Sequence, residues 1–380
     1  MRREDELLTC LLGLNARAAY LKQVEQILSG SSVDWQYILN KSYREKVYPL
    51  IYRGLKNLNG LVPLSVREEF KRKYYANSLS NTLVFEEAEK IIAKFSEKNI
   101  KTIAIKGVFL AEHVYKNIAL RPMSDIDLLI AKDNLKEANL LLNSLGYITP
   151  DSYFDFLKNS RILPLNTLMY KKERPFKYCL HLHWHLVNTT WPLEDLVSRI
   201  DMFSVWSKVQ STKIGGVDAL ALCPEHLLIY LCLHAFIHSF DNLMRLSDIA
   251  MVLSSYAENL DWQRIDYFSR EWGISGIVYF SLALTEELLG LKSLNSKYTG
   301  MLKPGFQKFI YSYLAKRGLR SYRMCWLAFL FLQKGFSPKL RFVKRSFLPS
   351  SLILAHNLGL PPSRIRPTHY LHRLKNLLTP

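Results

Sequence analysis

The residues best suited to chemistry are two aspartates, Asp125 and Asp127, which flank Ile126 and lead directly into the apolar run 128–130. That run predicts a buried β-strand. Side chains alternate across a strand, so both carboxylates should lie on the same face. Neighbouring carboxylates repel each other unless a cation lies between them, and hard oxygen ligands suit Mg²⁺ together with substrate phosphates. The pair therefore predicts a divalent metal site that receives a triphosphate.

A second segment upstream has the pattern of a phosphate-binding turn. A short apolar run, 102–105, ends in Lys106 and Gly107 and is followed by a helical pattern over 108–115. A strand that passes through glycine into a helix offers backbone N–H groups and the positive end of the helix dipole to a phosphate. Lys106 would add a positive charge. The predicted order is strand, turn, helix, loop and then the strand with the paired acids.

This ordered set of residues resembles a known family. Ile105-Lys106-Gly107, Arg121 and the string Ser124-Asp125-Ile126-Asp127-Leu128-Leu129 are similar to the uncharacterised bacterial nucleotidyltransferase family of the polymerase-β-type nucleotidyltransferase superfamily. The resemblance implies an α+β fold, in which a small mixed-sheet core is flanked by N-terminal and C-terminal helical regions. It also implies transfer of an NMP from an NTP to an acceptor, with release of pyrophosphate.

The resemblance also implies roles for individual residues. Asp125 and Asp127 would be catalytic and would hold Mg²⁺, or Mn²⁺ in its place. The contacts to the nucleotide would come from the turn and the loop that follows it, namely from Lys106, Gly107, Arg121 and Ser124.

A later segment, 177–187, places three histidines at every second position. Period-2 alternation puts His181, His183 and His185 on one face of a strand. The family often has an acid, an apolar residue and then His-Trp at this place; His183 and Trp184 fit, whereas His181 stands where the acid is expected. A third acid would activate the acceptor or help to bind metal. A neutral imidazole can do either, but it moves the metal preference from Mg²⁺ towards Mn²⁺ or Zn²⁺. His181 and His183 are therefore candidate catalytic residues.

Two other functions fit parts of the same pattern. A zinc-dependent hydrolase would use His181 and His183 with Asp127 as metal ligands. A non-catalytic nucleotide-binding protein would keep the transferase core and dock through a basic tail, and the missing third acid favours it. These alternatives differ in metal content and in turnover of NTP.

Hydrophobic periodicity and charge divide the chain into four parts. We expect an N-terminal helical region over 1–97, a nucleotidyltransferase-like α/β core over 98–190, a helical domain over 191–290 and a basic, aromatic-rich region over 291–380. In the first part we expect helices over 37–58 and 65–97, with Pro49 kinking or starting a helix.

The helical domain carries further polar residues and extends the family resemblance to about 100–290. Pro224 should open a helix on which His234 and His238 share one face. Helix packing is favoured over substrate contact for this pair. Arg245 would either pair with Asp248 or hold a phosphate.

The positive charge is concentrated at one end of the sequence. Of the 51 Lys and Arg residues, 17 lie after Glu287, where there is no Asp or Glu; the other 34 accompany all 33 acidic residues. A basic segment rich in aromatic residues suits an anionic surface, either nucleic acid or membrane headgroups. We therefore expect an anionic partner at 291–380.

Length and cysteine usage limit the remaining possibilities. At 380 residues the chain has ample material for a core, and its five cysteines form no CxxC pair, which suits a reducing compartment. No run reaches the roughly 18 apolar residues that cross a bilayer. The N-terminus carries acids where a signal peptide would be basic. We expect a cytoplasmic protein, or one peripheral to the membrane.

Overall fold

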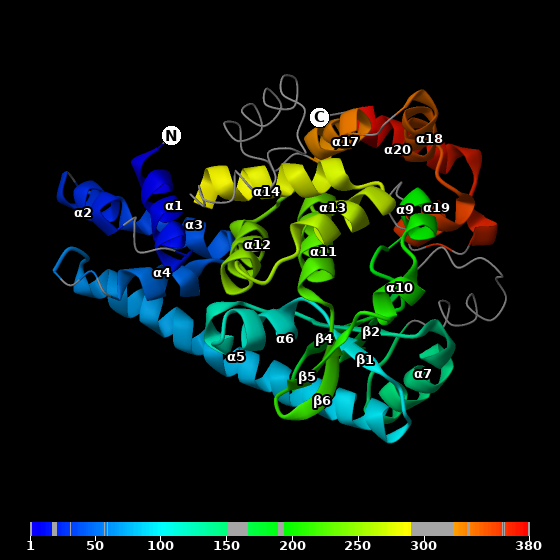
Figure 1. Cartoon of the computed structure of the whole chain (residues 1–380), viewed down its shortest axis with the longest axis horizontal. Helices are drawn as coiled ribbons and strands as arrows, with labels where there is room; N and C mark the ends of the chain where they lie inside the picture. Colours follow the sequence, from blue (N-terminus) through cyan, green and yellow to red (C-terminus); the bar gives the residue numbers. More distant parts are fainter. Residues whose placement is uncertain are drawn as a thin grey trace.

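The protein is a mixed α/β structure built on one six-stranded sheet (Figure 1). The computed structural model describes residues 2–16, 21–30, 32–56, 58, 60–149, 166–188, 194–289, 322–332, 335–358, 360 and 362–378. The strands are β1 (Thr102–Ala104), β2 (Ile126–Ile130), β3 (Thr167–Lys172), β4 (Tyr178–His183), β5 (Gln210–Ile214) and β6 (Val217–Ala221). Helices flank this sheet on both sides in sequence, which confirms the predicted fold class.

Strand β2 lies near the centre of the sheet and is buried along its whole length. The strand order is β3-β4-β2-β1-β6-β5, and β2 pairs antiparallel with β1 and parallel with β4. In the β2–β4 register Asp127 is paired with His181 and Leu129 with His183. The sheet thus brings the two chemically promising strands side by side.

The sheet extends beyond the predicted core boundary at residue 190. Residues 210–221 form an antiparallel hairpin, β5–β6, and β6 joins the sheet by pairing parallel with β1. The sequence pattern predicts a helical domain over 191–290 and misses these two strands. Each is only five residues long, and the alternation of apolar and polar residues in them is weak. The turn residues Gly215 and Gly216, both with positive φ, carry the hairpin signal.

The N-terminal region is helical, as expected, but the predicted helix over 37–58 is divided. Its elements are α1 (Arg3–Ala16), α2 (Leu21–Gly30), α3 (Trp35–Arg44), α4 (Tyr48–Leu55) and α5 (Leu64–Glu97). The chain breaks after α3, where Lys46 has a left-handed φ of 59°. Pro49 lies in the first turn of α4, so it starts a helix, a position that tolerates the missing N–H group.

Helix α5 is 34 residues long and runs along the sheet and the first helices (Figure 1). Two of its buried asparagines fasten the 3-10 turn η3 (Ile118–Leu120) that precedes β2. Asn77 donates to the carbonyl of Ala119 at 2.8 Å, and Asn81 donates to the carbonyl of Arg121 at 2.9 Å. These bonds position the loop that leads to the paired aspartates.

We expect Asn81→Ala to lower the free energy of unfolding by about 1–3 kcal/mol, because it leaves buried carbonyl groups without a donor. Urea unfolding would measure this. Asn40→Ala, an exposed asparagine of α3, is the control and should change stability by less than about 0.5 kcal/mol. Equal effects of the two substitutions would contradict the role of Asn81.

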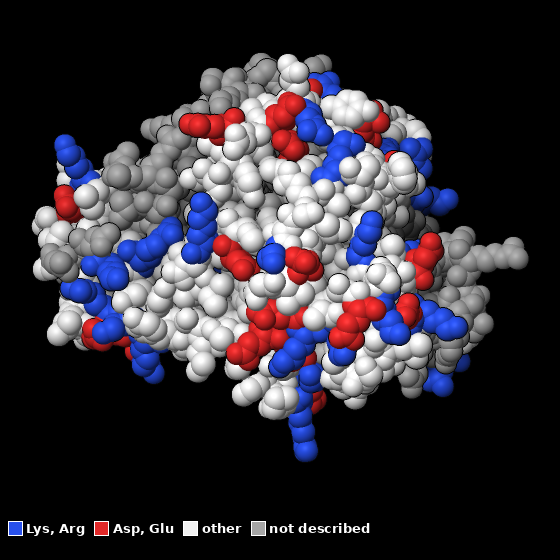
Figure 2. All heavy atoms as spheres, turned by 60° about the horizontal axis from the view of Figure 1, so that its bottom comes forward, with Lys and Arg blue, Asp and Glu red and all other residues white. Residues whose placement is uncertain are grey.

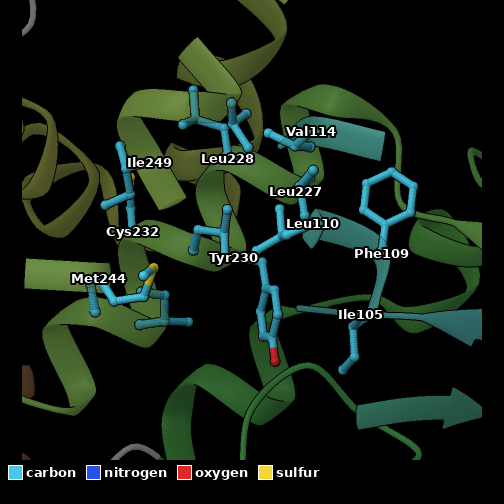
Figure 3. Close-up of a cluster of buried hydrophobic side chains, with 14 of the residues drawn as sticks. Ile105, Phe109, Leu110, Val114, Leu227, Leu228, Tyr230, Cys232, Met244 and Ile249 are labelled. Carbon is cyan, nitrogen blue, oxygen red and sulfur yellow. The ribbon is translucent and has the colours of Figure 1, made fainter. Parts of the chain in front are cut away.

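A layer of helices packs above the sheet (Figure 1). It consists of α11 (Pro224–Ile237), α12 (Leu243–Ser255), α13 (Trp262–Glu271) and α14 (Ser275–Leu289). The short helices α6 (Gly107–Phe109) and α10 (Met202–Trp206) lie nearer the sheet, α9 (Glu194–Arg199) lies above α10, and α7 (Leu135–Ser144) packs against α5. Proline opens α11 as predicted. Figure 3 shows Leu110 beside Leu227 and Tyr230 of α11, so α11 packs on the segment that directly follows α6.

His226 of α11 is buried between Phe268 and Trp272, and neither ring nitrogen has a partner among the described residues. Burial, assisted by the charges of Lys208 and Arg264, lowers the pKa of His226 to about 4. An unfolded histidine takes up its proton near pH 6.5, so the unfolded state binds more protons between these values. Stability should therefore fall as the pH falls from about 6.5 to 4.

We expect His226→Phe to reduce this acid sensitivity by about 2–3 kcal/mol at pH 4, relative to neutral pH. The apolar ring keeps the aromatic packing and carries no titrating nitrogen. Urea unfolding of both proteins from pH 4 to 8 would test this. Parallel pH profiles would contradict it.

The described part of the C-terminal region packs through aromatic side chains. Its elements are α17 (Tyr322–Leu332), α18 (Phe336–Phe347), α19 (Ser351–Leu358), η7 (Pro362–Arg364) and α20 (Pro367–Leu378). The ring of Phe329 lies 6.1 Å from that of Phe236 in α11 and 4.6 Å from that of Phe342 in α18. The region is therefore attached to the helical layer.

The predicted anionic partner of 291–380 remains a prediction. Residues 290–321, which overlap the predicted basic, aromatic-rich region 291–380, lie outside the described residues. On α18, Arg341 and Lys344 are exposed. Figure 2 shows acidic and basic side chains interspersed over one face of the molecule. No helix among the described residues is long and apolar enough to cross a membrane.

Candidate active site

The two aspartates lie together at the start of β2. Asp127 lies within the strand and is buried. Asp125 is the residue just before the strand begins and is half-buried. One imidazole faces both: Nδ1 of His181 is 3.3 Å from Oδ2 of Asp125 and 3.6 Å from Oδ1 of Asp127. Ser124 is exposed beside them, with its hydroxyl 3.4 Å from Asp125 Oδ1. The two carboxylates thus share a face, as strand alternation requires.

His183 is held in one orientation by a contact at each ring nitrogen. Nε2 lies 2.9 Å from Asp127 Oδ1, and Nδ1 lies 2.7 Å from the hydroxyl of Thr167 on β3. Burial lowers the pKa of His183 to about 4, although the bond to Asp127 opposes the shift. The ring is therefore neutral at neutral pH, which is the state that can ligate a metal.

Lys106 completes the group of polar residues around Asp127. Its Nζ donates to Asp127 Oδ1 at 2.7 Å, and its backbone has a φ of 54°, which is unusual for a lysine. Burial opposes the charged form of each partner, but their mutual attraction raises the pKa of Lys106 and lowers that of Asp127 well below its ordinary range. Tyr230 of α11 covers the pair, with its ring centroid 5.9 Å from Nζ.

Arg121 forms a buried ion pair with Asp248 of α12. Its Nε and Nη2 each donate to one carboxylate oxygen at 2.8 Å, and Tyr115 donates to Oδ1 at 2.9 Å. The alternative in which Arg245 pairs with Asp248 is wrong, because Arg121 occupies that carboxylate. Arg245 instead donates to Asp241 at 2.6 Å and to Nε2 of His234 at 2.5 Å.

Gly107 lies against Arg121 at the start of α6. A Cβ at this position would lie 3.1 Å from Met123 Sδ and 3.3 Å from Arg121 Nη1. The absence of a side chain therefore keeps the Lys106–Gly107 turn close to the arginine. Lys106, Gly107 and Arg121 form one wall above the aspartates.

These residues line a cleft of about 200 Å³ between the sheet and the helical layer. Its lining holds all the candidate nucleotide-binding residues, both aspartates and His181, and also Lys46, Pro122, His234, His238, Asn242, Met244, Arg245 and Asp248. A wider pocket of about 730 Å³ lies at the opposite end of the sheet, around Trp206 and Thr102, and Lys101 and Asp218 are its only charged lining residues. The chemistry therefore concentrates in the smaller cleft.

Several residues that line the cleft were not predicted as site residues from the sequence. Packing was favoured for His234 and His238, yet both line the cleft, and burial lowers the pKa of each below its ordinary value. Lys46 and Asn242 carry no local sequence signal for a site. His185, in contrast, lies beyond the end of β4, where Nδ1 accepts the N–H of Val187 at 3.0 Å.

The side chains in the cleft fit a divalent cation. One ligand atom each from Asp127, His181 and His183 lies within 4.8 Å of the others. Asp125 also contacts His181. Two carboxylates and neutral imidazoles are suitable ligands for Mg²⁺ or Mn²⁺, and the imidazoles also suit Zn²⁺. Thr167 supplies the second hydrogen bond that usually orients a ligating histidine.

The mixed sheet and the paired aspartates beside the Lys106–Gly107 turn agree with the family resemblance seen in the sequence. A family described as uncharacterised nucleotidyltransferase matches residues 31–290, which is more than half of the chain. The chain belongs to this family. The match begins in the N-terminal helices, well before the segment that carries the resemblance in the sequence, and it ends before the basic C-terminal region.

No curated protein matches the chain significantly. Among solved structures, an antigenic nucleotidyltransferase-like protein from Paracoccidioides brasiliensis is similar at 17% sequence identity with a TM-score of 0.36, over 58% of this chain and 93% of that chain.

Proposed function

We propose that this protein transfers an NMP from an NTP to an acceptor and releases pyrophosphate, in a metal-dependent reaction. The supporting observation is that Asp125 and Asp127 lie together in one cleft with Lys106 and Gly107, in a chain whose residues 31–290 match a nucleotidyltransferase family. Fold alone does not define a reaction, so the proposal rests on this group of side chains.

Each residue of the group has a role in the proposed reaction. Asp125 and Asp127 would hold Mg²⁺ or Mn²⁺, which supplies charge stabilisation for the attacking and leaving oxygens when it is bound. Lys106, fixed by Asp127, would neutralise phosphate charge next to the Gly107 turn. Ser124, which is exposed beside Asp125, would donate to a phosphate oxygen.

The acceptor hydroxyl or amine would meet His181. This imidazole lies beside both carboxylates, and its side chain retains 29% exposure, so a ligand in the cleft can reach it. It would accept the proton of the acceptor or hold the acceptor in line with the α-phosphorus. His183 is more deeply buried and would position Asp127.

Labelled nucleotide provides the direct test. The protein would be incubated with each of the four NTPs carrying α-phosphate label, Mg²⁺ or Mn²⁺, and an extract that supplies acceptors. We expect the α-label to move to a larger molecule. In a parallel reaction with γ-labelled NTP, the label should appear in pyrophosphate. Release of free NMP without a labelled acceptor, or no turnover with any NTP, would refute the proposed reaction.

A second candidate is a zinc-dependent hydrolase, which the grouping of Asp127, His181 and His183 favours. Metal analysis of the purified protein separates the two. Stoichiometric zinc that survives dialysis would support the hydrolase. Mg²⁺ or Mn²⁺ binding that requires an NTP would support nucleotidyl transfer.

A further inference from the structure

The cleft holds four basic side chains, and three of them are paired with acids. Lys106 bonds Asp127, Arg121 bonds Asp248, and Arg245 bonds Asp241. The fourth, Lys46, is exposed and makes no ion pair with any described residue. An unpaired cation in a cleft that already holds the metal-binding carboxylates is available to an anionic ligand.

Lys46 is placed in the cleft by a fixed turn. It lies between α3 and α4, and its neighbour Glu45 is buried. Oε2 of Glu45 accepts the N–H of Leu243 at 3.1 Å, and the carbonyl of Glu45 accepts the N–H of Met244 at 3.3 Å. Both donors belong to the first turn of α12, where a carboxylate is favoured by the helix dipole. The turn is therefore fastened to the cleft wall.

The backbone of Lys46 is strained, which also suggests a function. Its φ of 59° is in the left-handed region, which disfavours residues with a side chain. Such strain persists where the surroundings enforce it and is concentrated at functional sites. Lys106, the other lysine of this cleft, shares a positive φ.

The wall next to Lys46 also has an unused hydrogen-bond acceptor. Asn242 is 8% exposed and lines the cleft, and its Nδ2 donates to Asp241 at 2.8 Å. That bond fixes the amide orientation, and Oδ1 then has no partner among the described residues. A buried acceptor of this kind usually has a donor when the site is filled. A phosphate oxygen offers no donor, so Asn242 Oδ1 would accept from a water molecule that also donates to the bound anion.

We propose that Lys46 binds the β- and γ-phosphates of the nucleotide, the part that leaves as pyrophosphate. This inference rests on the proposed function. A triphosphate carries several negative charges, and the paired carboxylates partly offset the charges of Lys106, Arg121 and Arg245, so its tail needs a further cation. Lysine binds phosphate as a point charge. The N-terminal helices then form part of the active site, consistent with a family match that begins at residue 31.

Inorganic tripolyphosphate with Mg²⁺ tests this inference without turnover. Calorimetry would compare the full-length protein with Lys46→Gln and Lys46→Arg. The matched control is Lys116→Gln, because Lys116 is also exposed, has a φ of 53° and does not line the cleft. We expect about tenfold weaker binding for Lys46→Gln, partial recovery for Lys46→Arg and no change for Lys116→Gln. Equal affinities for the two glutamine variants, or no binding by the unaltered protein, would overturn the inference.

The variant Lys46→Gly distinguishes the effect of the ammonium charge from the effect of the backbone strain. Glycine adopts a positive φ without strain, so the melting temperature should rise while tripolyphosphate binding falls as much as in Lys46→Gln. Retained binding in Lys46→Gly would exclude a role for the charge. In labelled transfer, Lys46→Gln should raise KM for the NTP about tenfold. If no NTP turns over but the tripolyphosphate contrast holds, the proposed reaction fails and the anion site stands.

Discussion

Asp125→Asn is expected to lower nucleotidyl transfer by on the order of a thousandfold while the protein remains folded. Asparagine keeps the shape of aspartate but removes the charge that holds a divalent cation. Asp125 is half-buried and lies outside the strand, and its contacts are Ser124 and His181 at the cleft surface. The melting temperature should therefore change by no more than about 2 °C. Label transfer and thermal unfolding measured on the same preparation test both parts.

A matched control and a second substitution make this result interpretable. Asp218→Asn removes the charge of an aspartate whose side chain is 86% exposed on β6, and it should leave transfer unchanged. Asp127→Asn should also abolish transfer, but it leaves the buried Lys106 without its counter-charge and should destabilise the fold as well. Near-normal transfer by Asp125→Asn would eliminate the metal mechanism.

Strand β2 and the facing of its paired aspartates could be predicted from the sequence because their signal is local. The apolar run after Asp127 and the alternation around His181 are properties of neighbouring residues, and they determine burial and facing direction. The Lys106–Gly107 turn was predicted for the same reason. In each case the relevant residues lie within a few positions of one another.

The opposite wall of the cleft could not be predicted in this way. Lys46 reaches the site because Glu45 is bonded to the start of α12, 198 positions later in the chain. Arg121 and Asp248 are 127 positions apart, and nothing near Arg245 indicated that Asp248 would have another partner. The β5–β6 hairpin was missed because its strands are short and only partly buried. Such features depend on tertiary packing rather than on local pattern.

Asp248→Ala is expected to cost about 3–5 kcal/mol of stability, the largest such effect that we predict. The substitution removes the acceptor of two bonds from the Arg121 guanidinium and of the Tyr115 hydroxyl. The arginine side chain is only 12% exposed, so its charge would remain buried without a partner. Urea unfolding measures the loss. Asp266→Ala, which removes a carboxylate paired with Arg270, whose side chain is 58% exposed, should cost about 1 kcal/mol or less.

The double variant Arg121→Met, Asp248→Leu distinguishes structural support from substrate binding. An apolar pair of similar volume should recover most of the stability lost in Asp248→Ala, because it leaves no unpaired charge. We expect KM for the NTP to stay raised in this variant, because Arg121 Nη1 lies beside Gly107, where the triphosphate would bind. A stable double variant with unaltered KM would show that Arg121 supports the fold alone. The predicted nucleotide contact would then be reduced to Lys106, Gly107 and Ser124.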